Sequence, residues 1–137
     1  MRGRALALLC LPALLSPALA SPSPMAGVWF GTGQPGDRSE MYIDYLLPDG
    51  VFRNQHRYCR KGKALDIVEI GTWAFDGRIW TVHIQTINGQ AQPRTDTYQV
   101  SSVDARAQHY VYLPTRFPYT SHRVANDFAM PGCDMTS

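Results

Sequence analysis

The sequence predicts an all-β fold of about eight short antiparallel strands that follow one another along the chain. Turn-forming pairs such as Asp76-Gly77 and Asn88-Gly89 recur, separated by runs of about 8–12 residues, the spacing of hairpins in a β-sandwich or β-barrel. No run of ten or more residues combines helical periodicity with capping residues, so a parallel α/β sheet is not expected. With 137 residues, 45% hydrophobic and 18% charged, the chain has the composition of one ordinary globular domain.

The first twenty residues have the pattern of a secretory signal peptide. Arg2 and Arg4 precede an apolar stretch that is too short to span a membrane, and Ala18 and Ala20 supply small residues before the cleavage point. We therefore divide the chain into a signal peptide at residues 1–20, an extended proline-rich leader at 21–25 and a β domain with a C-terminal tail at 26–137. The expected location is periplasmic or secreted.

The charge balance argues against nucleic acid and anionic lipid as partners. The chain has 13 basic and 11 acidic residues, and loss of Arg2 and Arg4 with the signal peptide makes the two numbers equal. A net-neutral protein has no overall electrostatic attraction to polyanions. We expect neither a nucleic-acid partner nor a membrane-spanning segment.

Two cysteines remain after removal of the signal peptide, which contains Cys10. An even number of cysteines in an oxidising compartment indicates a disulfide, here between Cys59 and Cys133.

The turn signals divide the β domain into about eight expected strands. In chain order, these strands are residues 27–33, 40–47, 51–60, 65–75, 78–87, 95–103, 109–113 and 120–124. Pro93 cannot donate a backbone hydrogen bond, so we expect it to form a bulge in the strand after Asn88-Gly89, and the register is not extended beyond that point.

The hairpin around Asp76-Gly77 assigns one face of two strands to the interior. A two-residue turn there places Trp73 opposite Trp80, and residues opposite one another in an antiparallel pair share a face. The same register places Glu69 on this face. Because the face holds two tryptophans, it is expected to point inward.

The preceding hairpin, around residues 48–50, allows a two-residue turn or a three-residue turn with a bulge. The hydrophobic pattern favours the two-residue turn, which directs apolar side chains inward and charged ones outward. The inward group is then Met41, Ile43, Tyr45, Leu47, Phe52 and Tyr58, and the outward group is Glu40, Asp44, Arg53, Arg57 and Cys59. In either register His56 shares its face with Phe52 and Tyr58, because alternation along one strand fixes this.

The start of the first expected strand, Gly27-Val28-Trp29, resembles the Gly-x-Trp opening of lipocalin-like, or calycin, barrels. Those proteins are single antiparallel up-and-down β-barrels of eight strands, and they place an arginine across the tryptophan. Arg123 corresponds to that arginine, and a disulfide from mid-barrel to the C-terminal tail is similar to the lipocalin arrangement. The resemblance therefore implies an up-and-down barrel in which Trp29 and Arg123 close one end.

Two other families are similar in smaller parts of the chain. The string from Gly27 to Gly33 resembles the start of nitrobindin-like haem barrels, whose haem-binding histidine would correspond to His122. Small periplasmic metalloprotease inhibitors are also disulfide-bonded eight-stranded barrels, and they insert an N-terminal leader into the protease cleft. Residues 21–25 have the stiffness that such a leader requires.

The sequence contains no motif for catalysis or for metal binding. It lacks the Gly-x-Ser-x-Gly, P-loop and dinucleotide-binding patterns. Its four histidines, His56, His83, His109 and His122, have no paired-ligand spacing. We therefore expect a protein that is not an enzyme and needs no metal or other cofactor.

Two polar residues on otherwise apolar faces, His56 and Glu69, indicate a binding cavity. A buried imidazole or carboxylate is costly without a partner, water or ligand, and the alternative for both is hydration at an open barrel end. With Tyr58, Trp73 and Trp80 they are expected to line one cavity. The expected function is binding of a small, partly apolar or amphipathic molecule in the barrel mouth. The alternative is inhibition of a protease through the N-terminal leader.

The signal-peptide assignment predicts that the exported protein begins at Ser21. Expression in a host with a secretory pathway should release a species that lacks residues 1–20, because Ala18 and Ala20 define the cleavage site. Intact-mass spectrometry of the secreted fraction measures this. A secreted species that retains Met1 would contradict the assignment.

Overall fold

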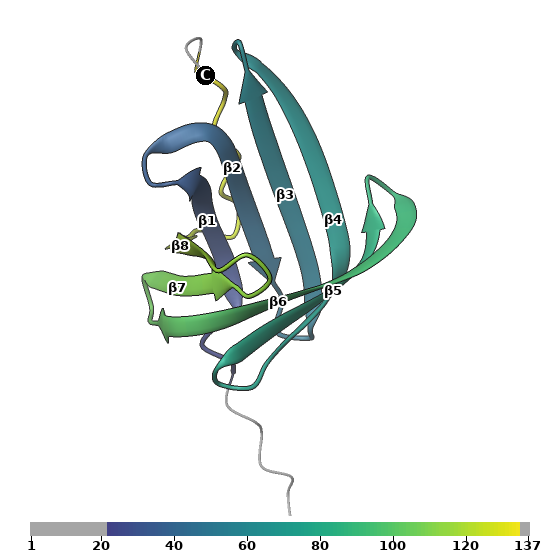
Figure 1. Cartoon of the computed structure of the whole chain (residues 1–137), viewed down its shortest axis with the longest axis vertical. Coiled ribbons are helices and arrows are strands. Elements are labelled where there is room, and N and C mark those ends of the chain that lie inside the picture. Colours follow the sequence, from purple (N-terminus) through teal and green to yellow (C-terminus); the bar gives the residue numbers. More distant parts are fainter. Residues whose placement is uncertain (1–21, 135–137) are drawn as a thin grey trace, which may run out of the picture.

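The computed structural model describes residues 22–134, which form one closed barrel of eight antiparallel strands (Figure 1). The strands are β1 (Gly27–Gln34), β2 (Asp37–Leu46), β3 (Val51–Arg60), β4 (Lys63–Phe75), β5 (Ile79–Ile87), β6 (Gln90–Val103), β7 (Ala107–Tyr112) and β8 (Phe117–Val124). Each strand pairs with its neighbours in sequence, and β1 pairs with β8 to close the barrel. The expected all-β, up-and-down barrel is confirmed. The proposed signal peptide and Ser21 lie outside the described residues, and residues 22–134 contain no helix long and apolar enough to cross a membrane.

The strand bounds agree with the expected ones to within three residues, except at the start of β6. This strand begins at Gln90 and not at residue 95, because it continues through Pro93. The register between β5 and β6 shifts between Ile84 and Thr86, next to this proline. A bulge accommodates a residue that cannot donate to the ladder, so the proline bends the strand without ending it.

The turn between β2 and β3 has three residues, 48–50. The backbone N–H of Gly50 donates to the carbonyl of Leu47 at 3.0 Å, and Gly50 has a φ of 88°. This left-handed conformation is typical of the bulged three-residue hairpin and is accessible to glycine without strain. In the resulting register Leu46 pairs with Phe52.

The expected orientation of β2 is therefore wrong. A three-residue turn changes the parity of the pairing, so every side chain of β2 lies on the face opposite to the expected one. The side chains of Glu40, Tyr42, Asp44 and Leu46 point into the barrel, and those of Met41, Ile43, Tyr45 and Leu47 lie on its outer face. On β3 the expectation is correct, with Phe52, His56 and Tyr58 inside and Arg53, Arg57 and Cys59 outside.

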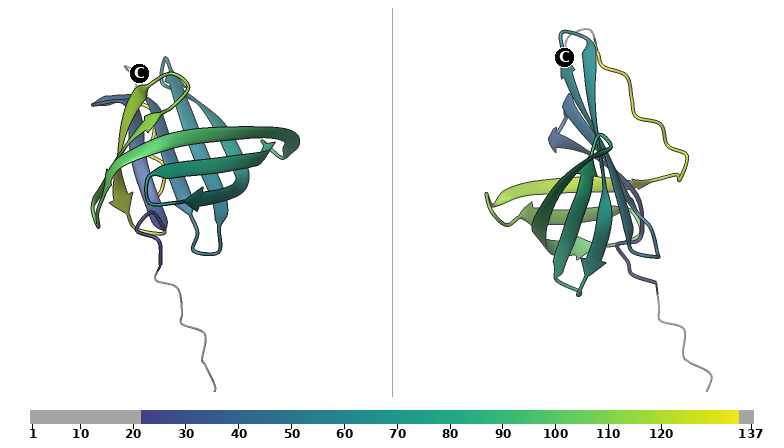
Figure 2. Two further views of the ribbon diagram at one scale, coloured as in Figure 1. Left: turned by 60° about the horizontal axis from the view of Figure 1, so that its bottom comes forward. Right: turned by 90° about the vertical axis from the view of Figure 1, so that its right-hand side faces the viewer.

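The chain after β8, residues 125–134, crosses the outside of the barrel as an extended tail (Figure 2). The ring of Phe128 packs against Phe30 on the outer face of β1, with 5.2 Å between the ring centroids. The tail then reaches β3, where Cys133 forms a disulfide with Cys59. The expected disulfide is confirmed.

The tail explains why two outward-facing side chains of β2 are inaccessible to solvent. Met41 and Ile43 are 0% exposed, although neither belongs to the core inside the barrel. Arg57, which pairs with Met41, donates a hydrogen bond from Nη1 to the carbonyl of Pro131 in the tail at 3.0 Å. The apolar face of β2 is thus buried between the barrel wall and the tail.

The turn between β4 and β5 is longer than the expected two residues. Phe75 pairs with Trp80, and Asp76 Oδ1 accepts two backbone N–H bonds within the connecting loop. Trp73 consequently lies opposite Val82 and not opposite Trp80. A shift of two residues preserves the face, so both tryptophans point inward as expected.

A bulge at Gly71 moves the remainder of this strand pair. Glu69 lies opposite Ile87, whereas the register expected from the sequence has it opposite Ile84. A Cβ atom at Gly71 would collide with the backbone carbonyl of His83, so β4 approaches β5 here as only glycine permits.

One end of the barrel is closed by a tryptophan and an arginine. The Arg123 guanidinium carbon lies 4.2 Å from the centroid of the Trp29 ring, and its Nη1 donates to the carbonyl of Ala26 at 2.8 Å. Trp29 Nε1 donates to the carbonyl of Met25 at 2.8 Å, and both Trp29 and Met25 are 0% exposed. Met25, expected from the sequence to belong to the leader, is therefore part of the core.

The disulfide should contribute strongly to thermal stability. The substitution Cys59→Ser frees a loop with a sequence separation of 74, which corresponds to a loss of up to about 4 kcal/mol in the chain-entropy model, and releases the tail from Met41 and Ile43. We expect a clearly lower melting temperature by circular dichroism. Ala64→Ser, at the position paired with Cys59, is the control and should melt close to the wild type. Two free thiols in the unfolded, unreduced wild type would contradict the prediction.

Candidate functional site

A cavity of about 460 Å³ occupies the barrel at the end opposite Trp29. Its entrance is marked by the side chains of Glu40 and His56, which are 37% and 24% exposed. Further along the same two strands, Asp44 and Asn54 are only 4% and 7% exposed. The cavity therefore opens at the Glu40 end of β2 and β3 and deepens toward Asp44 and Asn54.

Aromatic side chains form much of the lining. They are Tyr42, Tyr58, Tyr98, Tyr110, Tyr112, Tyr119, Phe52, His56 and Trp80. Tyr98 stacks on Trp80 with 4.6 Å between centroids, and Tyr110 meets Trp80 edge-on at 5.1 Å. Tyr119 stacks on Tyr110 at 5.5 Å, and the hydroxyl groups of Tyr110 and Tyr42 lie 2.7 Å apart. These contacts make a continuous aromatic wall from β5 to β8 and across to β2.

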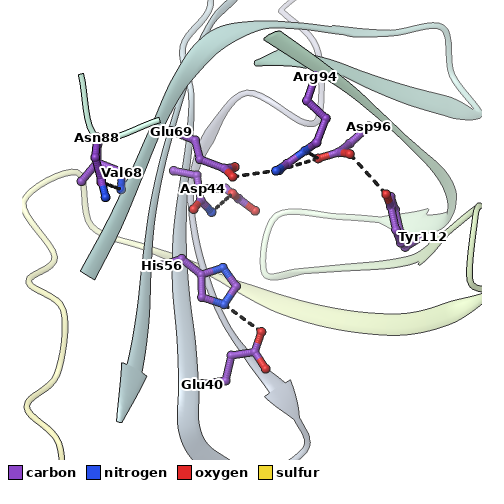
Figure 3. Close-up of polar contacts among 10 residues, drawn as sticks. Glu40, Asp44, His56, Val68, Glu69, Asn88, Arg94, Asp96 and Tyr112 are labelled. Carbon is purple, nitrogen blue, oxygen red and sulfur yellow. Dashed lines mark hydrogen bonds and ion pairs between the residues drawn. The ribbon is translucent and has the colours of Figure 1, made fainter. Parts of the chain in front are cut away.

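A histidine and a glutamate occupy the rim. Nε2 of His56 lies 2.8 Å from Oε1 of Glu40, as Figure 3 shows. The imidazole also stacks on the ring of Tyr58, with 4.6 Å between centroids and 14° between planes. Both contacts fix the orientation of the imidazole at the entrance.

On the opposite side of the cavity, one arginine joins two carboxylates (Figure 3). Arg94 Nη2 donates to Glu69 Oε1 at 2.8 Å and to Asp96 Oδ2 at 3.0 Å, while the hydroxyl of Tyr112 donates to Asp96 Oδ1 at 3.2 Å. Burial disfavours the charged guanidinium, but the hydrogen bond to Asp96 and the charge of Glu69 outweigh it and raise the pKa of Arg94. Two of the three guanidinium nitrogens, Nε and Nη2, therefore bind protein carboxylates.

Asp44 lies at the deep end of the cavity. Its Oδ1 accepts a hydrogen bond from Asn54 Nδ2 at 2.8 Å, and among residues 22–134 it forms no ion pair with a lysine or arginine. Burial raises the pKa of Asp44 to about 7; the hydrogen bond from Asn54 opposes this shift, and the negative charge of Glu69 adds to it. The Asp44 carboxyl thus lacks a cationic partner in the described part of the chain.

The structure brings together most of the residues that the sequence selected. His56, Tyr58, Glu69 and Trp80 all line the cavity. Trp73 does not, because its indole packs in the core toward the closed end of the barrel and donates from Nε1 to the carbonyl of Leu47 at 2.9 Å.

The polar residues deeper in the cavity were not predicted from the sequence. A two-residue turn at 48–50 would place Asp44 on the outer face, and the three-residue turn places it in the cavity. Arg94, Asp96 and Tyr98 alternate along β6 and share its inner face, but the register was not carried past Pro93. Their i, i+2, i+4 spacing was the available signal.

Two further observations bear on the chemistry of the site. Within residues 22–134 no group of three or more His, Cys, Asp or Glu side chains is arranged to hold a metal ion. Comparison of the chain with protein-family models, curated proteins and solved structures gives no match. Function must therefore be inferred from the geometry of the cavity.

Replacement of Asp44 by asparagine should change the pH dependence of folding stability. The pKa of Asp44 is about 7 in the folded protein and near 3.8 when unfolded. The raised pKa therefore destabilises the folded state relative to the unfolded chain. This destabilisation is negligible below about pH 4, grows as the pH rises toward 7, and is constant above pH 7. Urea unfolding should show Asp44→Asn to be more stable than the wild type by up to about 4 kcal/mol at pH 8, with little difference at pH 4.

The matched control is Asp127→Asn, which removes the same charge from an exposed position on the tail. If the free energy of unfolding of both variants depended on pH as it does in the wild type, the assignment of the raised pKa to Asp44 would be wrong.

Proposed function

We propose that the protein binds a small organic molecule inside the open end of its barrel. The observation that carries this proposal is the cavity itself, whose volume of about 460 Å³ lies within the range of small-molecule sites. Met25 and Trp29 fill the opposite end, so a ligand would enter past Glu40 and His56. An apolar wall with a few oriented polar groups is the usual composition of such sites.

Buried polar atoms without protein partners support the proposal. Asn54 Oδ1 and Trp80 Nε1 have no hydrogen-bond partner within residues 22–134, and both side chains line the cavity. Buried polar atoms are nearly always hydrogen-bonded, so these two are suited to a molecule that brings its own donor and acceptor. A ligand would in this way complete the hydrogen bonding of the barrel interior.

We also propose that the chain is a lipocalin-like, or calycin, protein of the periplasm or the extracellular space. The eight-stranded up-and-down topology, the Gly-x-Trp start and the contact of Trp29 with Arg123 support the family assignment. The Cys59–Cys133 disulfide supports the location, because such bonds persist mainly in oxidising compartments.

Inhibition of a protease through the leader stays a prediction and is the less favoured function. The described end of the leader contacts the barrel: Met25 is buried in the core, Arg123 donates to the carbonyl of Pro24 at 3.2 Å, and Ala26 N–H donates to that of Ser23 at 3.1 Å. A segment held in this way is less available for insertion into a protease cleft.

Filling part of the cavity should weaken binding. The neutral fluorescent dye N-phenyl-1-naphthylamine should gain emission on mixing with the wild type and quench tryptophan emission, because Trp80 lines the cavity. Ile67→Trp, on the inner face of β4, should weaken dye binding about tenfold or more, since the larger side chain occupies ligand volume.

Ile70→Trp is the matched control, because Ile70 lies on the same strand, 43% exposed on the outer face. It should bind the dye like the wild type. Absence of dye binding by the wild type, or equal binding by both variants, would refute the proposed site.

A further inference from the structure

We infer that the ligand is an organic cation, an ammonium group attached to an aromatic body. The inference rests on the proposed binding function and names its ligand class. It derives from three properties of the cavity: an excess of carboxyl groups, a buried acceptor oxygen without a partner in the described part of the chain, and a wall of aromatic faces.

The charges that line the cavity are unbalanced. Four carboxyl groups, from Glu40, Asp44, Glu69 and Asp96, face one arginine and one histidine. Arg94 is shared between Glu69 and Asp96, at 2.8 and 3.0 Å, and the histidine contacts Glu40 at the rim. Among the described residues that line the cavity, both basic side chains already contact a carboxylate, and an anionic ligand would meet carboxylates on three strands.

The deep end of the cavity has a carboxylate and an amide oxygen that the single hydrogen bond from Asn54 Nδ2 to Asp44 Oδ1 leaves incompletely satisfied. Asp44 is 4% exposed and Asn54 is 7% exposed; within residues 22–134 the first has no cationic neighbour and the second has an unpartnered Oδ1. Figure 3 draws the Glu69 carboxylate close to that of Asp44, and the charge of Glu69 acts on Asp44. An ammonium group has three N–H donors and no acceptor, so it can bond both Asp44 and Asn54 while compensating the negative charge.

The aromatic wall matches the rest of such a ligand. Trp80, Tyr98 and Tyr110 contact one another beside this acidic end, with centroids 4.6–5.4 Å apart. The faces of these rings carry negative potential, so they attract a nearby cation and also pack against an aromatic body. A neutral apolar molecule would use the wall but leave Asp44 uncompensated.

Three probes of the same shape and different charge test the inference. They are 2-(naphthalen-2-yl)ethylamine, which is a cation at pH 8, the neutral 2-(naphthalen-2-yl)ethanol, and the anionic 3-(naphthalen-2-yl)propanoate. Isothermal titration calorimetry at pH 8 should show the amine binding about tenfold or more tightly than the alcohol, which is the ratio expected from one charge-assisted hydrogen bond. The propanoate should bind most weakly.

Variants separate a specific contact from a general effect of charge. Asp44→Asn should reduce amine affinity about tenfold or more and alcohol affinity by a smaller factor, whereas Asp127→Asn on the tail should preserve the preference for the amine. Glu69→Gln is the second cavity variant and should weaken the amine with little effect on the alcohol. Retained alcohol binding shows in each case that the cavity is intact.

Each remaining outcome decides between the two proposals. Equal binding of amine and alcohol, or preference for the propanoate, would overturn the cation inference and leave the cavity as a binding site. Retention of the full amine preference in both Asp44→Asn and Glu69→Gln would overturn it as well. If none of the three probes bound, the inference and the proposed function would both fail.

Discussion

The left-handed backbone of Gly50 determines which side chains of β2 enter the barrel. With a φ of 88° it closes a three-residue turn, and the turn fixes the parity of the pairing between β2 and β3. Asp44 consequently lies inside the cavity, and Met41 and Ile43 lie outside it. A turn one residue shorter would direct the apolar side chains of β2 inward and Asp44 outward, so the contribution of β2 to the polarity of the cavity depends on this one backbone conformation.

The outward placement of Met41 and Ile43 is stable only because another segment covers them. The tail supplies that cover through Phe128 and through the disulfide to Cys59, so β2 is buried on both faces. This second layer allows the more apolar face of β2 to point away from the lumen. The interior is thereby left free for acidic and aromatic side chains.

Most of the fold could be predicted from the sequence, because turn residues mark the ends of nearly every strand. The inward position of His56 follows from alternation alone. Trp80 also points inward as expected, because its pairing differs from the expected one by two residues and a shift of two preserves the face. The orientation of β2 could not be predicted, since alternation cannot reveal a tail that buries the outer face. Arg94 and Asp96 lie beyond the bulge near Pro93, and alternation does not show how many residues a bulge contains.

The closure of the barrel also has a consequence for the order in which the chain folds. Each hairpin joins strands adjacent in sequence and can form as soon as both strands are synthesised, whereas Arg123 and Ala26 are 97 positions apart. Until β8 pairs with it, β1 is an open edge, and the disulfide needs Cys133, which lies beyond β8. The C-terminal segment thus closes a curled sheet with two exposed edges into a barrel.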